Sequence, residues 1–214
     1  MGSPEHQRRT RVAYDLVAED YARVLSSYPV ANRWDRAVLQ AFADAVAEQG
    51  GGLVADVGCG TGRMVGHLQG LGVDLVGLDL SPGMLAVARR DHPSLPCTAG
   101  TMAALPLGDS TLAGAIAWYS IIHTPPADQT GLLAELARVV RPGGEVLVAF
   151  QVGDECVHLE HAYGRDLDLD AHRLDPDGVS DRMEAAGIAV TARLVRDPID
   201  PEPQQQAYLA GRVS

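Results

Sequence analysis

The chain has 214 residues, a length that fits one domain with room for a short extension. Hydrophobic residues make up 46% and charged residues 21%, which is typical of a globular fold and excludes global disorder, collagen and coiled coil. The net charge of −11, with arginine as the only basic residue besides histidine, argues against nucleic acid and membrane surfaces as partners.

The first 50 residues predict two amphipathic helices, at 11–26 and 34–48, joined near Pro29. Apolar residues recur there with the i, i+3, i+4 and i+7 spacing of a helix that buries one face. We expect these helices to form an N-terminal helical cap over residues 1–50. The segment before them lacks the apolar stretch of a signal peptide, and the three cysteines form no CxxC pair, so we expect a cytoplasmic protein.

From residue 53 onward, short apolar segments alternate with helical patterns. The expected strands are at 53–57, 73–79, 95–99, 112–119 and 145–151. The expected helices are at about 62–70, 82–91 and 129–140. Ser81 and Pro82 provide a start signal for the second of these helices, and the sequence RPGG at 141–144 is expected to end the third before the next strand.

The composition changes after residue 151. Residues 154–185 contain ten acids and three arginines, and no long apolar run. We expect an acidic lid or insertion at 152–178, followed by a helix at about 177–186 and by strands at 188–195 and 205–212 that pair antiparallel. The whole chain is therefore expected to be one domain, with its central core at 53–151 and a C-terminal helix and strand hairpin at 179–214.

The chemistry is carried by the loop DVGCGTG at 56–62, which links a predicted strand to a predicted helix. Its alternating glycines allow a sharp turn and a close approach of a ligand to the backbone. Asp79 ends the next strand, where a carboxylate suits the two hydroxyls of a ribose. The spacing is GxGxG rather than GxGxxG, and Asp56 would repel a pyrophosphate but accept hydrogen bonds from an ammonium. The pattern predicts a nucleoside cofactor that carries an amino group and no phosphates.

Several segments together resemble the class I S-adenosylmethionine-dependent methyltransferases. They are VADVGCGTG at 54–62, VGLDLSPGML at 76–85, GTM at 100–102 with Leu105-Pro106, LARVVRPGG at 136–144, and the pattern YDxxAxxY at 14–21. The resemblance covers roughly residues 11–151 and is greatest to small bacterial members of undefined substrate. It implies a Rossmann-like, doubly wound α/β fold with a mostly parallel seven-stranded sheet, an antiparallel last strand and the N-terminal helical cap.

The resemblance also implies a role for individual residues in binding S-adenosylmethionine. The methionine part would be held by Asp56 and the loop residues Gly58, Cys59, Gly60, Thr61 and Gly62. Asp79 would bind the ribose, while Leu80 and Met84 would flank the adenine. Thr101 stands where the family often has an aspartate, and the backbone N–H of Met102 would meet an adenine nitrogen. Tyr14 and Tyr21 would close over the cofactor carboxylate.

Three further residues follow the fourth predicted strand, at the sheet edge where α/β proteins bind ligands. Trp118 and Tyr119 present π faces that suit a sulfonium, and Trp118 is expected to contact the cofactor. Tyr119 is a candidate catalytic residue. His123 is the candidate general base, because its ordinary pKa near 6.5 allows it to take a proton at neutral pH. A loop-capping or cofactor-contacting histidine remains the alternative.

Histidines in the acidic segment allow a metal-binding alternative. His158 and His161 would share one face if the segment were helical, and His172 lies nearby with several carboxylates. We expect no metal here and instead a solvated lid that shapes the acceptor pocket. Its charge favours a neutral or cationic acceptor over an anionic one.

The sequence therefore predicts a methyltransferase that moves a methyl group to O or N, and secondarily to S or C, of a small molecule, leaving S-adenosylhomocysteine. Two alternatives stay open: a protein that binds the same cofactor for a cyclisation or rearrangement or as a silent binding module, and an NAD(P)-dependent oxidoreductase. A monomer or a homodimer is expected. The identity of the acceptor is not predicted, because acceptor pockets are built from the segments that resemble the family least.

Overall fold

The computed structural model describes residues 4–25 and 32–214, so the predicted helix junction near Pro29 lies outside the described residues. The main strands are β1 (Leu53–Val57), β2 (Asp74–Asp79), β3 (Cys97–Ala99), β4 (Leu112–Trp118), β5 (Val140–Gln151), β8 (Ile188–Arg196) and β9 (Gln206–Val213). The helices are α1 (Pro4–Leu25), α2 (Arg33–Glu48), α3 (Val65–Gly70), α4 (Pro82–Asp91), α5 (Pro126–Val139), α6 (Pro176–Ala185) and the short 3-10 helix η1 (Ile121–His123).

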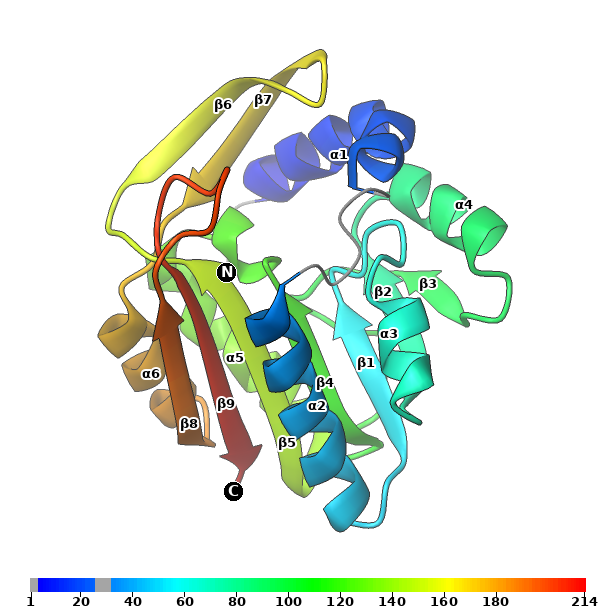
Figure 1. Ribbon diagram of the computed structural model, residues 1–214, viewed down its shortest axis with the longest axis vertical. Coiled ribbons are helices and arrows are strands. Elements are labelled where there is room, and N and C mark those ends of the chain that lie inside the picture. The colour runs from blue at the N-terminus through cyan, green and yellow to red at the C-terminus, as the bar shows by residue number, and fades with distance from the viewer. Residues whose placement is uncertain (1–3, 26–31) are drawn as a thin grey trace.

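These strands form one seven-stranded sheet in the order β3-β2-β1-β4-β5-β9-β8 (Figure 1). The strands β1 to β5 pair in parallel, while β9 pairs antiparallel with both β5 and β8. The predicted fold class is therefore confirmed, including the antiparallel strand and the pairing of the last two strands. The order reverses between β1 and β4, which is where open α/β sheets form a ligand crevice.

Helices cover both faces of the sheet, because successive strand residues point to opposite sides. On one face, α2 and α3 pack through Phe42 and Leu68 against sheet residues such as Leu147. On the other face, α5 and α6 pack through residues such as Leu136 against Val148. The strand β4 is buried along its whole length, as expected for the central strand of a doubly wound sheet.

The strand β5 starts earlier than predicted. The sequence RPGG at 141–144 was expected to separate a helix from the strand, but α5 ends at Val139 and β5 begins at Val140. The pairing with β4 shifts register between Leu112 and Gly114, so the extra residues are accommodated in a bulge. A bulge tolerates the missing N–H of Pro142, and Gly143 adopts a φ of +79° there.

The two N-terminal helices have different positions. The predicted cap consisted of both, but α2 lies in the helical layer on the sheet and buries Leu39, Phe42 and Val46. Only α1 lies above the carboxyl ends of the strands (Figure 1). It is attached to α4 by Asp15, which accepts hydrogen bonds from the Ser81 hydroxyl (2.6 Å) and the Gly83 backbone N–H (2.8 Å).

The acidic segment folds as a two-stranded antiparallel hairpin of β6 (Cys156–Ala162) and β7 (Arg165–His172), next to α1 (Figure 1). The helical spacing proposed for His158 and His161 is therefore wrong, because both lie on a strand. Each instead pairs through Nδ1 with an aspartate of β7, His158 with Asp170 (2.8 Å) and His161 with Asp166 (3.0 Å).

The described residues bear on two of the binding classes considered above, metal ions and membranes. Within residues 4–25 and 32–214, no group of three or more histidine, cysteine, aspartate or glutamate side chains is arranged to hold a metal ion. No helix in the same part of the chain is long and apolar enough to cross a bilayer.

Candidate functional site

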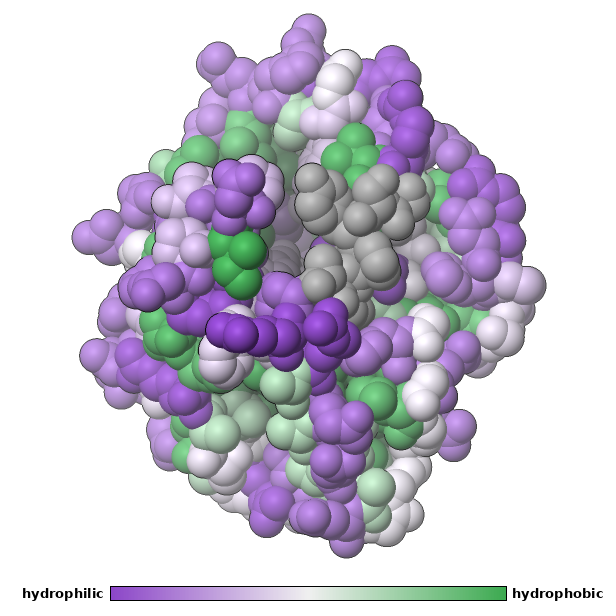
Figure 2. All heavy atoms as spheres, viewed as in Figure 1, coloured by the Kyte–Doolittle hydropathy of each residue, from purple (hydrophilic) through white to green (hydrophobic). Residues whose placement is uncertain are grey.

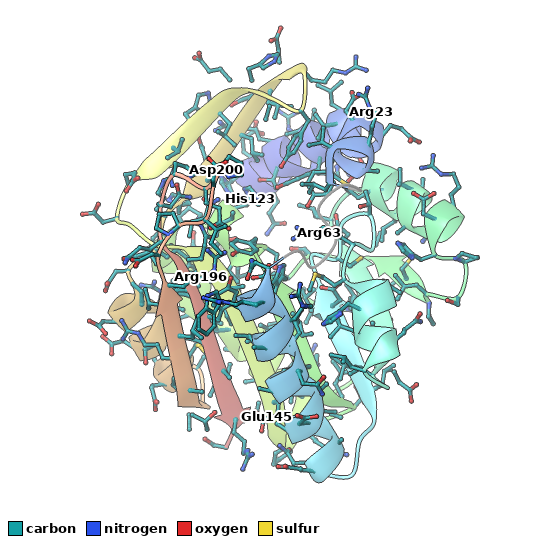
Figure 3. All side chains as sticks on the ribbon, in the orientation of Figure 1. Arg23, Arg63, His123, Glu145, Arg196 and Asp200 are labelled. Atoms are coloured by element: carbon teal, nitrogen blue, oxygen red, sulfur yellow. The ribbon has the colours of Figure 1, made fainter. Side chains whose placement is uncertain are left out.

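A cavity of about 380 Å³ lies at the carboxyl ends of the parallel strands, beneath α1 and the β6–β7 hairpin. The space-filling view shows this face hollowed near its centre, with a mostly hydrophilic surface around it (Figure 2). His123 and Arg63 lie on opposite sides of the space below α1 (Figure 3). The cavity thus occupies the position where the strand order reverses, as expected for a ligand site in this architecture.

The glycine loop after β1 forms one wall of the cavity. Gly58, Gly60 and Gly62 all have positive φ values, of +82°, +54° and +81°. A Cβ placed on Gly58 would lie 2.3 Å from the Cβ of Ser120, so a side chain cannot be accommodated without displacing the residues that follow β4. The backbone N–H groups of Gly58 and Cys59 donate to the Leu78 carbonyl (2.7 and 3.0 Å), which fixes the loop against β2.

Asp79 connects this loop to the start of α4. Its Oδ2 accepts a hydrogen bond from the Gly60 N–H, and its Oδ1 accepts one from the Ser81 N–H, both at 2.8 Å. Ser81 in turn caps α4 by accepting a bond from the Met84 N–H (3.0 Å), as its predicted place at the helix start requires. Burial raises the pKa of Asp79, although the two N–H groups oppose this shift. Asp79 also lines the cavity, where its carboxylate can accept further hydrogen bonds.

Asp56 lies at the end of β1, behind the glycine loop. Its side chain is 1% exposed, and neither carboxylate oxygen has a hydrogen-bond partner among the described residues. The pKa of this carboxyl is raised to about 7, mainly by burial and also by the charge of Asp79, while the charge of Arg63 opposes the shift. A buried carboxylate without a partner is costly, so this position favours a ligand that brings a hydrogen-bond donor or a positive charge.

The structure brings most of the predicted site residues together. Twelve of them line the cavity: Tyr14, Tyr21, Gly58, Gly60, Asp79, Leu80, Met84, Thr101, Met102, Trp118, Tyr119 and His123. The other four, Asp56, Cys59, Thr61 and Gly62, do not line it. Cys59 and Thr61 are buried in the loop, and burial raises the pKa of the Cys59 thiol, so this thiol is neutral. Thr101 uses its hydroxyl to accept a bond from the Ala103 N–H (3.2 Å).

His123 is held between three elements. Its Nδ1 lies 2.9 Å from the Asp170 carbonyl oxygen on β7, and its Nε2 lies 2.6 Å from the Tyr14 hydroxyl on α1. Since a carbonyl only accepts, Nδ1 carries the proton and Nε2 accepts from Tyr14. The His6 ring, also on α1, contacts the His123 carbonyl oxygen. Burial lowers the pKa of His123 to about 4, so the imidazole is neutral near pH 7.

Tyr119 begins a polar network on the other side of the cavity. It has a φ of +56°, which is rare for a residue with a side chain, and it donates a hydrogen bond to Tyr208. Tyr208 donates to Oδ1 of Asp35 (2.5 Å) and accepts from Nε of Arg196 (3.1 Å). Burial raises the pKa of both tyrosines, that of Tyr208 to about 12. Arg196 also pairs with both carboxylate oxygens of Glu202 (2.5 and 2.6 Å).

Sequence reasoning missed several residues of the cavity wall. Arg63 directly follows the glycine loop and is the one permanent cation that lines the cavity within the described ranges. Asp35, Glu202 and Gln206 also line it, and they come from α2, the loop before β9, and β9. The position of Arg63 beside the motif offered a signal. The other three belong to no motif: the pairing of β9 with β5 brings Gln206 and the preceding loop to the site, and the packing of α2 brings Asp35.

Comparisons with known proteins agree with this architecture. Residues 54–144 match a protein family described as "Methyltransferase domain". A demethylmenaquinone methyltransferase of Renibacterium salmoninarum is 34% identical over 144 residues, which cover 63% of this chain and 58% of the relative. The chain spans less than two thirds of the length of the first curated relatives that it matches.

Solved structures with similar folds have low sequence identity. A 1,6-didemethyltoxoflavin-N1-methyltransferase of Burkholderia thailandensis, solved with S-adenosylhomocysteine, has a TM-score of 0.73 at 17% identity and covers 100% of this chain and 92% of its own. A [4+2]-cyclase has a TM-score of 0.69 at 18% identity, with coverages of 97% and 96%. At such identities the likeness establishes the fold, and one fold hosts more than one chemistry.

Proposed function

Because residues 54–144 match a methyltransferase domain family, we propose that the chain is a class I S-adenosylmethionine-dependent methyltransferase, which binds S-adenosylmethionine and transfers its methyl group to a small-molecule acceptor. The sulfonium of this cofactor supplies an intrinsically reactive methyl group. The residues of the chain bind the two reactants, hold them in line and exclude water, which are the requirements of a displacement reaction. The second product is S-adenosylhomocysteine.

The observation that carries this proposal is the buried Asp56 carboxylate without a partner next to a glycine loop with positive φ values. An amino acid ammonium would satisfy the carboxylate, directly or through a water molecule, while a pyrophosphate would be repelled by it. The lack of space for a Cβ at Gly58 shows that the loop is packed against Ser120, which fixes the backbone that faces the cavity. These features favour S-adenosylmethionine over NAD(P).

Other residues of the cavity suit the remaining parts of the cofactor. Asp79 has lone pairs left to accept bonds from ribose hydroxyls, and Leu80 and Met84 offer apolar surface to an adenine. Tyr21 and Arg63 are placed beside the glycine loop to meet a carboxylate. Thr101 and the Met102 N–H lie at the same wall, and the predicted adenine contact of Met102 stays a prediction.

We further propose that His123 acts mainly by positioning. Its Nδ1 and Nε2 are both engaged, and the lowering of its pKa to about 4 makes it a weak proton acceptor at neutral pH. Its contacts hold Tyr14 and the β7 strand over the cavity. The role of His123 as a base, and a catalytic role for Tyr119, stay predictions. Substituting His123 by alanine separates these roles: loss of turnover with unchanged cofactor affinity favours the base, while weaker cofactor binding favours positioning.

The acceptor is proposed to be a small neutral or cationic molecule. Similar proteins include a demethylmenaquinone methyltransferase and a malonyl-[acyl-carrier protein] O-methyltransferase, which supports an organic acceptor for this chain. The cavity has room for such a group beyond the cofactor residues, between α1, α2 and β9. The acidic β6–β7 hairpin beside its entrance disfavours an anionic acceptor.

Isothermal titration of the cofactor-free protein tests the proposed function. We expect micromolar binding of S-adenosylmethionine and S-adenosylhomocysteine, and no binding of NAD. Substitution Asp79→Ala is expected to weaken both interactions at least about tenfold, because it removes charge-assisted hydrogen bonds. Absence of binding would contradict the proposal. Binding without S-adenosylhomocysteine formation in the presence of any acceptor would instead favour a cyclase or a silent binding module.

A further inference from the structure

The cavity has a second end, across two strands of the sheet from the glycine loop. The loop follows β1, whereas this second end is lined by Gln151 at the end of β5 and Gln206 at the start of β9, together with Asp35 of α2 and Glu202. We call these four residues the acceptor end. None of them belongs to the motifs that resemble the methyltransferase family.

Strand register sets the direction of the two glutamines. Gln151 pairs with Gln206, and two residues along the same strands Ala149 pairs with Tyr208. Residues two apart on a strand share a face, and directly paired residues share it as well. Ala149 and Tyr208 pack on the side that α2 covers. Gln151 and Gln206 therefore point to the same side of the sheet as Asp35, which the Tyr208 hydroxyl joins to β9.

Asp35 and Gln206 each contribute a hydrogen-bond acceptor to the acceptor end. Oδ1 of Asp35 accepts a bond from Tyr208 (2.5 Å), while its Oδ2 has no partner among the described residues. Gln206 is 2% exposed and uses its Nε2 to donate to the Gln204 carbonyl (3.0 Å), which leaves its Oε1 without a partner in the same part of the chain. Asp35 and Gln206 both line the cavity, so their oxygens are available to accept hydrogen bonds from a ligand that brings donors.

The charge at this end is negative. Glu202 is compensated by Arg196, whose guanidinium bonds both of its oxygens and does not itself line the cavity. Asp35 has no arginine partner among residues 4–25 and 32–214. Arg63 lies at the glycine-loop end, where its charge acts on Asp56 and Tyr21.

Of the remaining titratable groups near this space, His6 and His123 lie on the opposite wall, while Tyr119 and Tyr208 lie beside Asp35. His6 of α1 faces the His123 carbonyl, and His123 itself is neutral because burial lowers its pKa to about 4. Tyr119 and Tyr208 carry no charge near neutral pH, since burial raises the pKa of each. A negative group placed at the acceptor end would thus meet carboxylate and amide oxygens without a compensating cation.

We propose that the acceptor end binds an amino group of the methyl acceptor, so that the substrate class is a small primary or secondary amine. Asp35 is the charge partner of the bound ammonium, and Oε1 of Gln206 and the amide of Gln151 take its other N–H groups. This inference rests on the proposed function, because it concerns the second substrate of the same cavity. It concerns recognition of the amino group and does not assign the atom that is methylated.

Head-group selectivity tests the inference. Protein saturated with S-adenosylhomocysteine is titrated with three compounds of one skeleton, 2-phenylethylamine, 2-phenylethanol and 3-phenylpropanoate, and with the same three head groups on indole and n-hexyl skeletons. We expect the amine to bind at least about tenfold more tightly than the carboxylate on every skeleton that binds, as for a charge-assisted hydrogen bond. A carboxylate that binds as tightly as the amine, or no amine binding on any skeleton, would overturn the proposal.

Variants connect the selectivity to Asp35. Asp35→Asn is expected to lower amine affinity about tenfold or more and to remove the preference over the alcohol, while Asp35→Glu retains it. Asp44→Asn is the matched control, because Asp44 lies exposed on the same helix outside the cavity and loses the same charge. Thermal unfolding of each variant shows that it is folded. Unchanged amine affinity in folded Asp35→Asn contradicts the inference.

Titration with S-adenosylhomocysteine alone, recorded first on the same protein, separates the two proposals. If S-adenosylhomocysteine does not bind, the proposed function fails. If it binds and the amine preference is absent, the proposed function stands and the assignment of the acceptor end to an amine falls.

Discussion

The two ends of the cavity are assembled from the chain in different ways. The glycine-loop end consists of residues 54–102, where each strand leads directly into a loop that lines the wall. Its geometry depends on backbone groups, such as the Gly58 and Gly60 N–H groups that bond Leu78 and Asp79. The acceptor end is formed by side chains far apart in sequence, as the Tyr208–Asp35 hydrogen bond across 173 positions illustrates.

This difference explains why one end is far easier to identify in a sequence. Binding through the backbone restricts residue types, since positive φ and close approach select glycine at fixed spacing. Binding through side chains requires only that a suitable functional group reaches the cavity, and many residue types at many positions can provide such a group. The glycine-loop end therefore has a motif, and the acceptor end has none.

The largest effect is expected from Gly58→Ala at the glycine-loop end. The new Cβ would lie 2.3 Å from the Ser120 Cβ and would also force alanine into a φ of +82°. We expect a loss of about 3 kcal/mol in unfolding free energy, from left-handed strain plus overpacking. Cofactor binding should be lost as well. Urea unfolding and calorimetry measure both.

Gly72→Ala is the matched control for this substitution. Gly72 has a φ of +80°, and nothing lies within 4 Å of a Cβ placed there. Its cost should be that of backbone strain alone, about 1 kcal/mol, with unchanged cofactor affinity. Equal costs for the two variants would show that the loop does not depend on the close approach of Ser120.

The next effect concerns Asp56 and pH. Since the pKa of this buried carboxyl is raised to about 7, the free protein holds it protonated below that pH. An ammonium ligand favours the charged form, so affinity for S-adenosylhomocysteine should fall about 20-fold between pH 7.5 and pH 5.5. In Asp56→Asn this dependence should disappear. Calorimetric titration across this pH range measures it.

Glu145→Gln is the control for the loss of a buried carboxylate. Glu145 lies at the far end of β5 (Figure 3), where Arg212 and Gln49 bond it, and its removal should leave the pH profile of cofactor binding unchanged.

The effect of Asp56 on the stability of the fold also has a defined sign. An acid whose pKa is higher folded than unfolded makes unfolding easier as pH rises from about 4 to 7, and Asp56→Asn should remove this slope. If the pH dependence of cofactor binding or of stability persists in Asp56→Asn, Asp56 is excluded as its source.

Much of the fold could be predicted from sequence because the parallel strands are short, apolar and separated by clear helix signals such as Ser81 and Pro82. The exceptions have physical causes. RPGG at 141–144 is a strong turn signal, yet a β-bulge absorbs it within β5. The β6–β7 hairpin escaped prediction because charged residues dominate its strands and mask the short alternation on β7, where Leu169 and Ala171 are buried; pairing with each other and with α1 holds the two strands.

The residues of the site could be predicted from the sequence where they belong to a motif. Asp56 and Asp79 were found from their spacing around the glycine loop. The environment of His123 could not be read from sequence, because burial and the bonds to Tyr14 and the Asp170 carbonyl depend on how α1 and β7 close over it. That packing, and not residue type, lowers its pKa to about 4.

A smaller effect, confined to the acceptor end, is expected from Tyr208→Phe. The substitution removes the hydroxyl that joins Asp35, Arg196 and Tyr119, and leaves buried polar groups short of a partner. We expect a loss of about 1–2 kcal/mol in unfolding free energy. Affinity for S-adenosylhomocysteine should change less than about twofold, while amine affinity falls.

Tyr163→Phe is the control for this substitution, because the Tyr163 hydroxyl has no hydrogen bond among the described residues. Equal loss of affinity for both ligands would contradict the independence of the two ends.

The smallest effect is expected where the β6–β7 hairpin is tied to α1 at the surface. Nε of Arg165 lies 2.7 Å from Asp20, but Arg165 is more than half exposed, so water and salt screen the pair. Arg165→Gln should speed proteolytic cleavage of the hairpin only about two- to fivefold, and the difference should vanish in 1 M salt. Arg8→Gln breaks a pair with Glu5 whose arginine is similarly exposed and that stays within α1, so it should change nothing at the hairpin. If both variants behave alike, the hairpin is held over the cavity by its other contacts, those of Arg9 with Asp168 and of His123 with the Asp170 carbonyl, rather than by this ion pair.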